Sequence, residues 1–346
     1  NITGSRQYDA STNIAHSVVP NASITNTVNS ETLTLTGGVG TTTSANVGTY
    51  ELGNSSEGTL VLGNGTGLAS NYTLTGGTQT YTITQRVLNS SGSKIYDANT
   101  DAIAANITLS NLASSETLNH SGTASVGSAN AGSYTITNLS GVSIADGSNG
   151  GLASNYTLTG GTHNFTVNQR AISLSGTRLY DATTNAAASD LSTMANLVGS
   201  ETLTLSGTGS IASANVSSNK TVTTGTLALA DGSNGGLAAN YTLSGGTHQL
   251  TVNQRPLIAT LARQYDATTT AAGSDLSSFN DLQGGETLSV SGSGTATSAN
   301  VANSIAMANN GTLALADGTG LASNYSLNSR NNEIKKRYIT ITGRIL

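Results

Sequence analysis

Five short sequences recur four times along this chain, in the same order and at a nearly constant spacing of about 85 residues. They are Tyr-Asp-Ala, Glu-Thr-Leu, Ser-Ala-Asn, Gly-Leu-Ala-x-Asn-Tyr and a closing Gln-Arg. Self-similarity of this kind limits the chain to architectures built from one repeated unit. The landmarks stand at Tyr8, Tyr96, Tyr180 and Tyr265; at Glu31, Glu116, Glu201 and Glu286; at Ser44, Ser128, Ser213 and Ser298; at Tyr72, Tyr156, Tyr241 and Tyr325; and at Arg86, Arg170 and Arg255, with Lys336-Arg337 in the fourth copy.

The length of the repeat selects among these architectures. A β-helix or a leucine-rich solenoid repeats every ~20–30 residues, and no such shorter period is visible. A unit of about 85 residues is instead large enough to be a small domain with its own core. We therefore expect four domains, followed by the start of a further repeat or a C-terminal strand. The expected boundaries are 1–86 (repeat 1), 87–170 (repeat 2), 171–255 (repeat 3), 256–337 (repeat 4) and 338–346.

Inside each repeat, apolar residues alternate with polar ones, which is the period of a β-strand. Leu33 and Leu35 alternate with Thr, as do Leu203 and Leu205. Charged residues make up only 9% of the chain, against roughly 25% in ordinary domains, and the helix formers Lys, Glu, Gln and Met are scarce. The pattern predicts an all-β fold of four tandem β-sandwich-like domains, each with about six to eight short strands.

Two segments carry local signals. Tyr72 and Leu74 lead into Gly76-Gly77, and Tyr81 follows, so we expect a β-hairpin whose glycines supply the positive φ of a tight turn. Residues 186–197 fit either a short helix or an irregular crossover. The glycine pair recurs as Gly160-Gly161 and Gly245-Gly246, and the fourth copy has Leu327-Asn328-Ser329-Arg330 instead.

The repeats follow one another without a linker. Residues 166–170 run directly into residues 171–174, with no Gly/Ser-rich or Pro-rich segment between them. We therefore expect limited bending and an extended rod, roughly 120–180 Å long if each unit measures roughly 30–45 Å. The thin cores lead us to expect that stability rises with repeat number. The tail from Tyr338 resembles the opening strand of a repeat and the head from Asn1 a shortened one, which favours a longer parent array.

Charge and cysteine content argue against several classes of function. The net charge of −5 is spread thinly and forms no basic stripe, so we expect no nucleic-acid partner. No apolar stretch approaches the ~20 residues that span a bilayer, so we expect no membrane insertion. Cysteine is absent, which suits secretion of an unfolded chain that needs no oxidative folding, although cytosolic proteins can lack it too.

Several of these motifs resemble a known family. The basic-x-Tyr-Asp opening, the central Ala-Asn-Val-Gly from Ala45 to Gly48, and the closing Asn-Tyr-x-Leu…Gln-Arg resemble the YDG repeat of very large secreted bacterial adhesins of the filamentous haemagglutinin type. The resemblance covers nearly the whole chain and implies two-partner secretion, surface display and a role in cell adhesion or biofilm. The third residue of the opening motif is Ala where the family usually has Gly, so we expect that this turn needs no positive φ. These residues are Ala10, Ala98, Ala182 and Ala267.

The Tyr-Asp pair is a candidate ligand site, but a structural role explains it better. The ring packs and its hydroxyl finds a local partner, while the Asp caps a turn. The basic residue two positions before each Tyr favours a salt bridge to the recurring Glu, which contributes up to ~1 kcal/mol if exposed. A Lys–Asn isopeptide staple would need lysine, and three of the four copies have Arg. The pairs are Tyr8-Asp9, Tyr96-Asp97, Tyr180-Asp181 and Tyr265-Asp266, and the basic residues are Arg6, Lys94, Arg178 and Arg263.

Metal and catalytic sites are poorly supported. Asp146 with Asn149, and Asp231 with Asn234, offer oxygen ligands for Ca²⁺, but ordinary polar turns explain them better because the first repeat has no carboxylate there. Histidines are scattered and cysteine is absent, so we expect no transition metal and no cofactor. No copy carries a unique polar constellation, so we expect no enzyme.

Three functions fit a set of near-copies. The first, which the lack of any privileged copy favours, is a stalk or spacer of a secreted or surface adhesin that holds a binding region away from the bacterial cell. In the second, the repeats bind host or bacterial surface glycans or proteins weakly, with avidity. In the third, the tail strand of one chain pairs with the head of the next in a matrix fibre. Sequons at one repeat position are candidate glycosylation sites, although composition alone generates many; they are Asn71, Asn155, Asn240 and Asn324.

Overall fold

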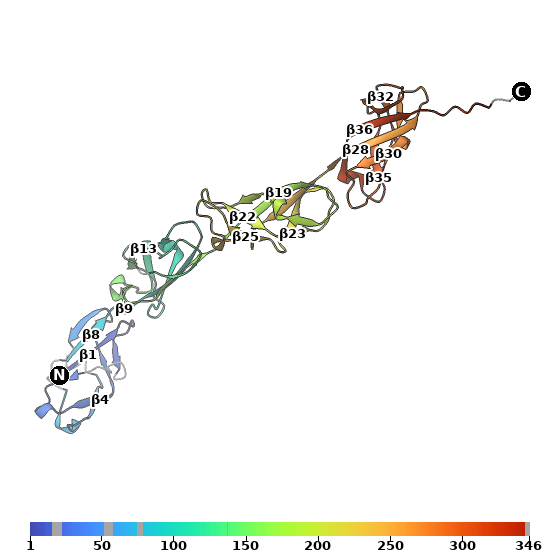
Figure 1. Ribbon diagram of the computed structural model, residues 1–346. Coiled ribbons are helices and arrows are strands. Elements are labelled where there is room, and N and C mark those ends of the chain that lie inside the picture. The colour runs from blue at the N-terminus through green and yellow to red at the C-terminus, as the bar shows by residue number, and fades with distance from the viewer. Residues whose placement is uncertain (16–22, 52–57, 75–78, 137, 343–346) are drawn as a thin grey trace. The chain divides into compact units, whose positions relative to one another are not determined.

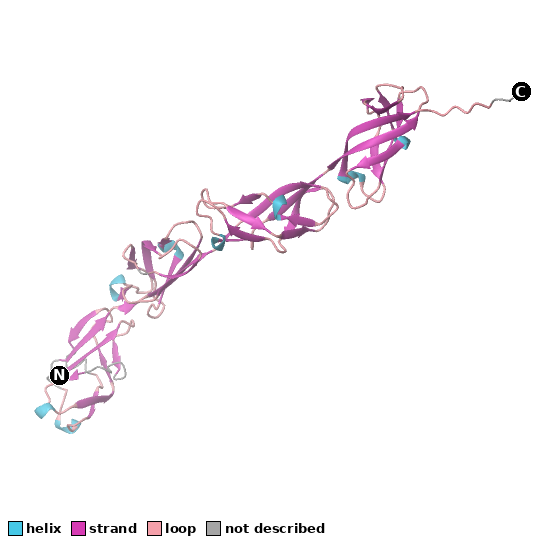
Figure 2. Cartoon of the chain, viewed as in Figure 1, coloured by secondary structure: helices cyan, strands magenta, loops and turns pink. Residues whose placement is uncertain are grey.

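The computed structural model describes residues 1–15, 23–51, 58–74, 79–136 and 138–342. Within these ranges the regular structure is β-strand with single turns of 3-10 helix, so the all-β prediction is confirmed (Figure 2). The helices found there are all too short to cross a membrane. The chain divides into two compact units, Asn1–Gln169 and Arg170–Leu346, each of which holds two of the sequence repeats.

The first unit contains strands β1 to β17, several of which are labelled in Figure 1. In repeat 1 they are β1 (Ile2–Gln7), β2 (Asn13–Ala15), β3 (Ser23–Ile24), β4 (Leu33–Gly37), β5 (Val39–Thr41), β6 (Gly48–Glu51), β7 (Val61–Asn64) and β8 (Gln79–Thr84). Then follow β9 (Arg86–Val87), β10 (Asn89–Ile95), β11 (Asp101–Ile103), β12 (Ile107–Ser110), β13 (Leu118–Ser125), β14 (Gly132–Thr135), β15 (Val142–Asp146), β16 (Tyr156–Thr157) and β17 (His163–Asn168). The 3-10 turns are Val28–Ser30, Ala69–Asn71, Ala104–Asn106 and Ala153–Asn155.

The second unit contains strands β18 to β36. They begin with β18 (Arg170–Ala171), β19 (Ser173–Leu179), β20 (Asn185–Ala187), β21 (Thr193–Ala195), β22 (Leu203–Ser206), β23 (Thr208–Ile211), β24 (Ser217–Thr223), β25 (Ala228–Asp231), β26 (Tyr241–Thr242) and β27 (His248–Asn253). Then follow β28 (Arg255–Gln264), β29 (Thr270–Ala272), β30 (Leu276–Asn280), β31 (Leu288–Ser291), β32 (Ser293–Ala296), β33 (Ala302–Ile305), β34 (Met307–Asn309), β35 (Ala314–Asp317) and β36 (Tyr325–Lys335). The 3-10 turns are Ala188–Asp190, Ala238–Asn240, Gly273–Asp275 and Ala322–Asn324.

A parallel pair of strands lies at the centre of every repeat. The first long strand pairs in parallel with the last long strand, and an antiparallel strand flanks each of them. Because these two strands run in the same direction, the chain enters the sheet at one end and leaves it at the other. The strand orders are β3-β1-β8-β6, β12-β10-β17-β14, β21-β19-β27-β24 and β30-β28-β36-β33, the third of which continues into β23 and β20.

A second set of strands in each repeat is antiparallel. Its strands follow the predicted alternation, since Leu33, Leu203 and Leu288 are buried and the residue after each is exposed. The period of two therefore reports one buried face, as it does in half-buried sheets. The pairs are β4 with β7, β13 with β15, β22 with β25 and β31 with β35, together with β2 with β5, β11 with β13, β20 with β23 and β29 with β32.

The predicted hairpin around the glycine pair is wrong. In repeat 2 the strands before and after Gly160-Gly161 both run parallel to the opening of the repeat: β16 pairs with β9, and β17 pairs with β10. The glycines thus lie in a loop between two strands that run in the same direction. Gly160 does have a positive φ of 85°. Gly161 is needed because a Cβ there would lie 1.9 Å from the carbonyl oxygen of Leu88. Gly76 and Gly77 lie outside the described residues.

Residues 186–197 form no α-helix. Strand β20 ends at Ala187, one 3-10 turn covers Ala188–Asp190, and the chain resumes as β21 beside β19. The side chain of Asp190 accepts the N–H of Ala187 at 3.1 Å, which satisfies that donor within a single turn. The irregular crossover is therefore the correct alternative.

The core is built on the last long strand of each repeat. Its alternate residues are buried, as Tyr81 and Ile83 are in β8. In the first unit one apolar cluster contains Tyr8 and Tyr81 of repeat 1 together with Leu88 and Tyr156 of repeat 2. The apolar core is therefore continuous between these two repeats.

Candidate functional site

Two tyrosines from different repeats share one carboxylate. The hydroxyl of Tyr8 donates to Oε1 of Glu116 at 2.5 Å, and the hydroxyl of Tyr156 donates to Oε2 of the same residue at 2.6 Å. The two rings meet edge to face, with centroids 5.4 Å apart and an interplanar angle of 79°. We call Tyr8, Glu116 and Tyr156 the tyrosine clamp, and it joins repeat 1 to repeat 2.

The clamp keeps both hydroxyls protonated. Burial, together with the hydrogen bond to Glu116, raises the pKa of Tyr156 to about 12. Burial and the same carboxylate also raise the pKa of Tyr8. A neutral phenol donates to the carboxylate, whereas a phenolate would repel it, so the clamp closes with neutral tyrosines.

A buried amide makes the second contact between the repeats. Oδ1 of Asn155 accepts the backbone N–H of Val47 at 2.9 Å, and its Nδ2 donates to Oδ1 of Asn46 at 3.0 Å. Asn155 is 0% exposed, so both of its polar atoms need partners inside the protein. Asn46 ends the Ser-Ala-Asn landmark of repeat 1 and Val47 follows it, and Asn155 belongs to the Gly-Leu-Ala-x-Asn-Tyr landmark of repeat 2.

The closing Gln-Arg pair makes the third contact. Gln85 donates through Nε2 to the carbonyl oxygen of Tyr156 at 2.9 Å. Arg86 donates through Nη1 to the carbonyl oxygen of Tyr8 at 3.2 Å and through Nε to that of Asn111 at 2.6 Å. Arg86 also lies in β9, which pairs with β16, so backbone hydrogen bonds and side-chain hydrogen bonds stabilise the same contact. Asn111 has a positive φ of 65°, which Asn tolerates better than most residues do.

The same arrangement joins repeat 3 to repeat 4. Tyr180 and Tyr325 donate to Glu286 at 2.6 and 2.7 Å, and their rings meet edge to face at 5.2 Å. Asn324 accepts the N–H of Val216 at 2.9 Å and donates to Asn215 at 3.0 Å. The remaining contacts are Gln254 to the carbonyl oxygen of Ser323 at 3.1 Å, and Arg255 to the carbonyl oxygen of Tyr180 at 3.2 Å and to Asp281 at 2.9 Å.

The Tyr-Asp-Ala corner folds on itself. Oδ1 of Asp9 accepts the N–H of Ser11 at 2.9 Å, while Arg6 forms an ion pair with Asp9. Arg178 with Asp181, Arg263 with Asp266, and Lys94 with Asp97 repeat this ion pair. The expected salt bridge from these basic residues to the recurring Glu is therefore wrong. The physical reason is that the basic side chain closes the local turn, while the Glu accepts a hydrogen bond from a tyrosine hydroxyl.

The alanine of this corner has a left-handed backbone. The φ angles are 63° at Ala10, 62° at Ala98, 61° at Ala182 and 67° at Ala267. The expectation that Ala marks a turn without positive φ is therefore wrong. The Asp carboxylate and the basic side chain fix the backbone on both sides of the alanine, so the local contacts outweigh a strain of about 1–2 kcal/mol.

The remaining recurring residues occupy positions in their own repeats that correspond to those described for the joint between repeats 1 and 2. Tyr241 donates to Glu201 at 2.6 Å, and Tyr72 donates to Glu31 at 2.6 Å. Arg170 donates through Nε to the carbonyl oxygen of Asn196 at 2.8 Å. Tyr96 is buried at the end of β10, and its N–H bonds to the carbonyl oxygen of Asn168 at 2.9 Å, whereas Tyr265 is 38% exposed.

The candidate calcium ligands form hydrogen bonds to the backbone around their own turns. Oδ1 of Asp146 accepts the N–H of Ala153 at 2.8 Å, and Nδ2 of Asn149 donates to the carbonyl oxygen of Ser115 at 3.0 Å. Asp231 and Asn234 make the same bonds in repeat 3. Uncharged Asn64 takes this place in repeat 1 and accepts the N–H of Ala69 at 2.8 Å, so the position works without a charge. In the described part of the chain, no three His, Asp or Glu side chains gather as a metal site.

The sequons at one repeat position differ in access. Asn155, Asn240 and Asn324 are buried, so a glycosyltransferase could not reach their amides in the folded protein. Asn71 is exposed.

The sequence identified these recurring residues, but it did not show which of them contact one another across two repeats. It expected a local partner for the hydroxyl of Tyr8, whereas that partner stands 108 residues further along the chain. The sequence did contain a signal for these contacts. The landmarks recur in every copy, although within the described part of one copy they form no binding or catalytic site. Residues that recur in every copy without local chemistry are candidates for contacts between copies.

Comparison with known families gives one match. A model of the YDG domain family matches three consecutive stretches, residues 78–164, 162–251 and 248–332, which together span most of the chain. No curated protein matches the chain.

Proposed function

Because the chain belongs to the YDG domain family, we propose that it is a structural stalk, or spacer, of a bacterial cell-surface or secreted adhesin. In this proposal each repeat is a β-sandwich-like domain, and four of them stack end to end in an extended rod. The rod holds a binding region away from the cell and performs no catalysis. Its role in adhesion and biofilm formation is to set the distance between the binding region and the cell.

One observation carries the proposal: the recurring landmarks converge on the contacts between repeats. Tyr8, Asn46 and Arg86 of one joint, with Glu116 and Asn155, account for all five landmarks. A repeat that binds glycans would place its recurring polar groups in an exposed pocket instead. Here they are used to join one copy to the next, which is what a spacer needs.

The direction of the strands also supports the proposal. The parallel pairing of β1 with β8, and of β10 with β17, sends the chain out of each repeat at the end opposite to its start. Successive copies then add length. The joints between repeats 1 and 2 and between repeats 3 and 4 are held by side-chain and backbone bonds, so little reach is lost to bending there.

The test compares the chain with a flexible spacer. The full chain and a Gly/Ser linker of equal residue number are each placed between a membrane anchor and a small binding tip on bacteria. We expect a rod of roughly 120–180 Å in small-angle scattering and firm adhesion to a receptor beneath a thick polymer layer. The linker, with an end-to-end distance of about 100 Å and no stiffness, should adhere weakly.

Equal adhesion by the two spacers would contradict the stalk. Saturable binding of the chain itself on a glycan array would favour the second function, in which the repeats are the adhesive surface.

A further inference from the structure

The Tyr-Asp-Ala corner of repeat 2 differs from the other three corners at two positions. Repeats 1, 3 and 4 have Arg two residues before the Tyr and Ser or Thr directly after the Ala, whereas repeat 2 has Lys94 and Asn99. The two changes therefore occur together, in one copy. A guanidinium and a hydroxyl do not condense with each other, but the amine of a lysine and the carboxamide of an asparagine can.

The amine of Lys94 lies against the carboxamide of Asn99. Its Nζ donates to Oδ1 of Asn99 at 2.6 Å and to the backbone carbonyl oxygen of the same residue at 2.7 Å. The side chain of Lys94 is 6% exposed, because it lies on the face of β10 that it shares with its buried partner Val167. The amine is thus held beside the carbonyl group that it would attack.

One carboxylate bridges the nitrogen that would attack and the nitrogen that would leave. Oδ1 of Asp97 lies 2.8 Å from Nζ of Lys94, and Oδ2 of Asp97 accepts Nδ2 of Asn99 at 3.0 Å. Although burial raises it, hydrogen bonds from Lys94 and from the N–H of Asn99 hold the pKa of Asp97 below its ordinary value. Asp97 is therefore ionised at neutral pH and can carry protons from one nitrogen to the other.

A backbone donor points at the oxygen on which negative charge would develop. The N–H of Asp101 donates to Oδ1 of Asn99 at 2.9 Å. This bond and the one from Nζ of Lys94 polarise the carbonyl group and identify the oxygen end of the carboxamide. The N–H of Asn99 donates to Oδ1 of Asp97 at 3.1 Å, so the carboxamide and the carboxylate stay in register.

The corner of repeat 3 has a similar set of bonds without the reactive pair. Arg178 forms an ion pair with Asp181 and donates to Oγ1 of Thr183 at 3.1 Å. Oγ1 of Thr183 also donates to Oδ1 of Asp181 at 3.0 Å. The turn thus needs a basic side chain, an aspartate and a small polar side chain, but neither lysine nor asparagine. Their joint presence in repeat 2 adds chemistry that the turn itself does not require.

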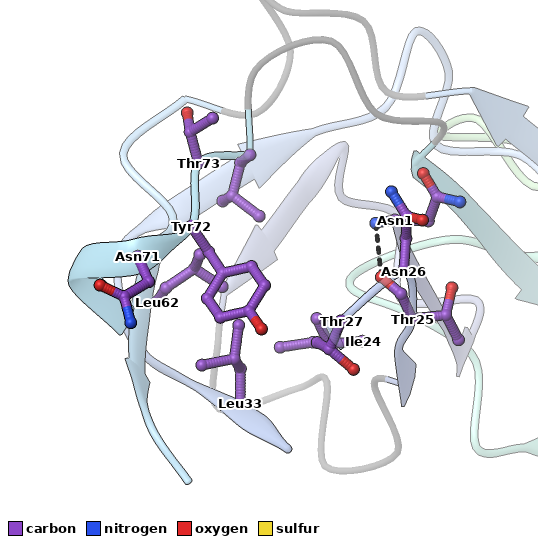
Figure 3. Close-up of a pocket in the computed structure, with 11 residues that line it drawn as sticks. Asn1, Ile24, Thr25, Asn26, Thr27, Leu33, Leu62, Asn71, Tyr72 and Thr73 are labelled. Carbon is purple, nitrogen blue, oxygen red and sulfur yellow. Dashed lines mark hydrogen bonds between the residues drawn. The ribbon is translucent and has the colours of Figure 1, made fainter. Parts of the chain in front are cut away.

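The asparagines at the cavity of repeat 1 are a useful contrast. This cavity of about 330 Å³ is lined by Asn26 and Asn71 together with Leu33 and Tyr72 (Figure 3). Among the described residues that line it there is no lysine, aspartate or glutamate. A carboxamide without a bound amine and a base does not react, so an asparagine alone marks no site.

We propose that Lys94 and Asn99 form an intramolecular isopeptide bond, with Asp97 as the proton carrier. Nζ of Lys94 attacks Cγ of Asn99, so that the Nζ–Cγ bond forms and the Cγ–Nδ2 bond breaks. Of the three protons on Nζ, one stays in the new amide and two pass through Asp97 to Nδ2, which departs as an ammonium ion. The reaction needs no oxidant, reductant or further reactant.

The bond closes a ring over residues 94–99. The ring contains the landmark Tyr96 and the left-handed Ala98, whose φ is 62°. The corner is then fixed by a covalent bond that persists when the chain unfolds. This inference does not depend on the stalk function.

The first test is mass spectrometry of the full chain, produced without any added enzyme. We expect a mass below that of the sequence by one ammonia. Cleavage of the backbone before Asp97 opens the ring, and the pieces on its two sides should stay joined through Lys94 and Asn99. A chain of full mass, or one that loses ammonia but separates at this cleavage, would overturn the proposal.

Matched variants exchange the corners of repeats 2 and 3. The double substitution Lys94→Arg, Asn99→Thr gives repeat 2 the residues of repeat 3, so it should fold and keep its full mass. The reverse pair, Arg178→Lys with Thr183→Asn, should create a second bond and lower the mass by two ammonias. Ammonia loss that persists in the first variant, or only one ammonia lost in the second, would contradict the assignment.

The substitution Asp97→Asn tests the proton carrier. It keeps the shape of the side chain and removes the carboxylate, so the bond should form about a hundredfold more slowly. The linked fraction is followed over time after synthesis, and circular dichroism shows whether the variant is folded. An unchanged rate in a folded variant would exclude Asp97 from the reaction.

Discussion

The same face of the repeat occurs twice in the first unit, once covered and once open. In repeat 2 the hydroxyl of Tyr156 bonds to Glu116 at 2.6 Å and accepts the N–H of Ala113 at 3.0 Å. In repeat 1 the hydroxyl of Tyr72 bonds to Glu31 at 2.6 Å and accepts the N–H of Val28 at 3.0 Å. Within the described residues, the difference is the tyrosine of a preceding repeat, Tyr8, whose hydroxyl bonds to Glu116. The half of the clamp that lies within one repeat therefore has the same hydrogen bonds in both copies.

Alkaline pH should separate the two faces most strongly. The pKa of Tyr156 is raised to about 12 in the folded chain, so the neutral phenol is the folded form. A group with a raised folded pKa stabilises fully below its unfolded pKa of about 10 and loses that contribution as the pH rises through about 12. We expect the covered clamp to open cooperatively in this window.

Parallel titrations by ultraviolet absorbance and circular dichroism would follow this opening. Tyrosinate formation and loss of structure should coincide in the natural chain. In a Tyr8→Phe, Tyr156→Phe double variant the step should lose amplitude. An unchanged step in that variant would place the pH-sensitive groups elsewhere.

Removing the charge of the shared carboxylate should give the next largest effect. Glu116→Gln weakens two buried charge-assisted bonds and should cost about 2–4 kcal/mol. Glu31→Gln is the matched control on the open face and should cost about 1 kcal/mol or less. Both residues lie in the unit Asn1–Gln169, so the same urea transition of the full chain reads both variants. Equal costs would mean that the clamp contributes nothing beyond its local half.

Removing one hydroxyl should have a smaller effect. Tyr8→Phe keeps the ring contact and deletes the bond to Glu116, which should cost about 1.5 kcal/mol. Tyr265→Phe changes the exposed counterpart and should stay within about 0.5 kcal/mol of the natural chain. Thermal and urea unfolding of the two variants would measure both. A large loss in Tyr265→Phe would show that the hydroxyl works within its own repeat.

The smallest expected effect is a gain. Ala10→Gly and Ala267→Gly relieve a left-handed alanine, which costs about 1–2 kcal/mol, and add back about 0.5–1 kcal/mol of backbone entropy. Each should stabilise the chain by about 0.5–1 kcal/mol, although one corner is docked and the other is exposed. A gain at only one corner, seen in the unfolding midpoint, would mean that docking rather than local contacts holds this backbone.

Much of the fold was predictable because its signals are local. The alternation around Leu33 and Leu203 gave the strands, and the landmarks gave the repeat. The hairpin prediction failed because a glycine pair has the same signature whether the chain reverses or continues. Only the parallel partner of β16, which lies about 70 residues away, distinguishes the two cases.

The joint was predictable only in part. The absence of a linker indicated close contact between repeats, but the partner of Tyr8 is set by the packing of two copies and has no local signature. Arg6 illustrates the opposite error. A basic residue and a Glu that recur in every copy suggested a pair. Asp9 pairs with Arg6 instead, because a turn brings it within reach at little additional cost in chain entropy.

The parallel ladder between β1 and β8 has a consequence for a chain held under tension. Pulling on the two ends of the repeat drives these strands past each other along their length. Six residue pairs, from Ile2 with Gln79 to Gln7 with Thr84, then bear the load together. A hairpin at the same place would open one bond at a time. The lifetime under force should therefore depend on how slowly the whole ladder shears, and on that unfolding rate rather than on the equilibrium stability of the repeat.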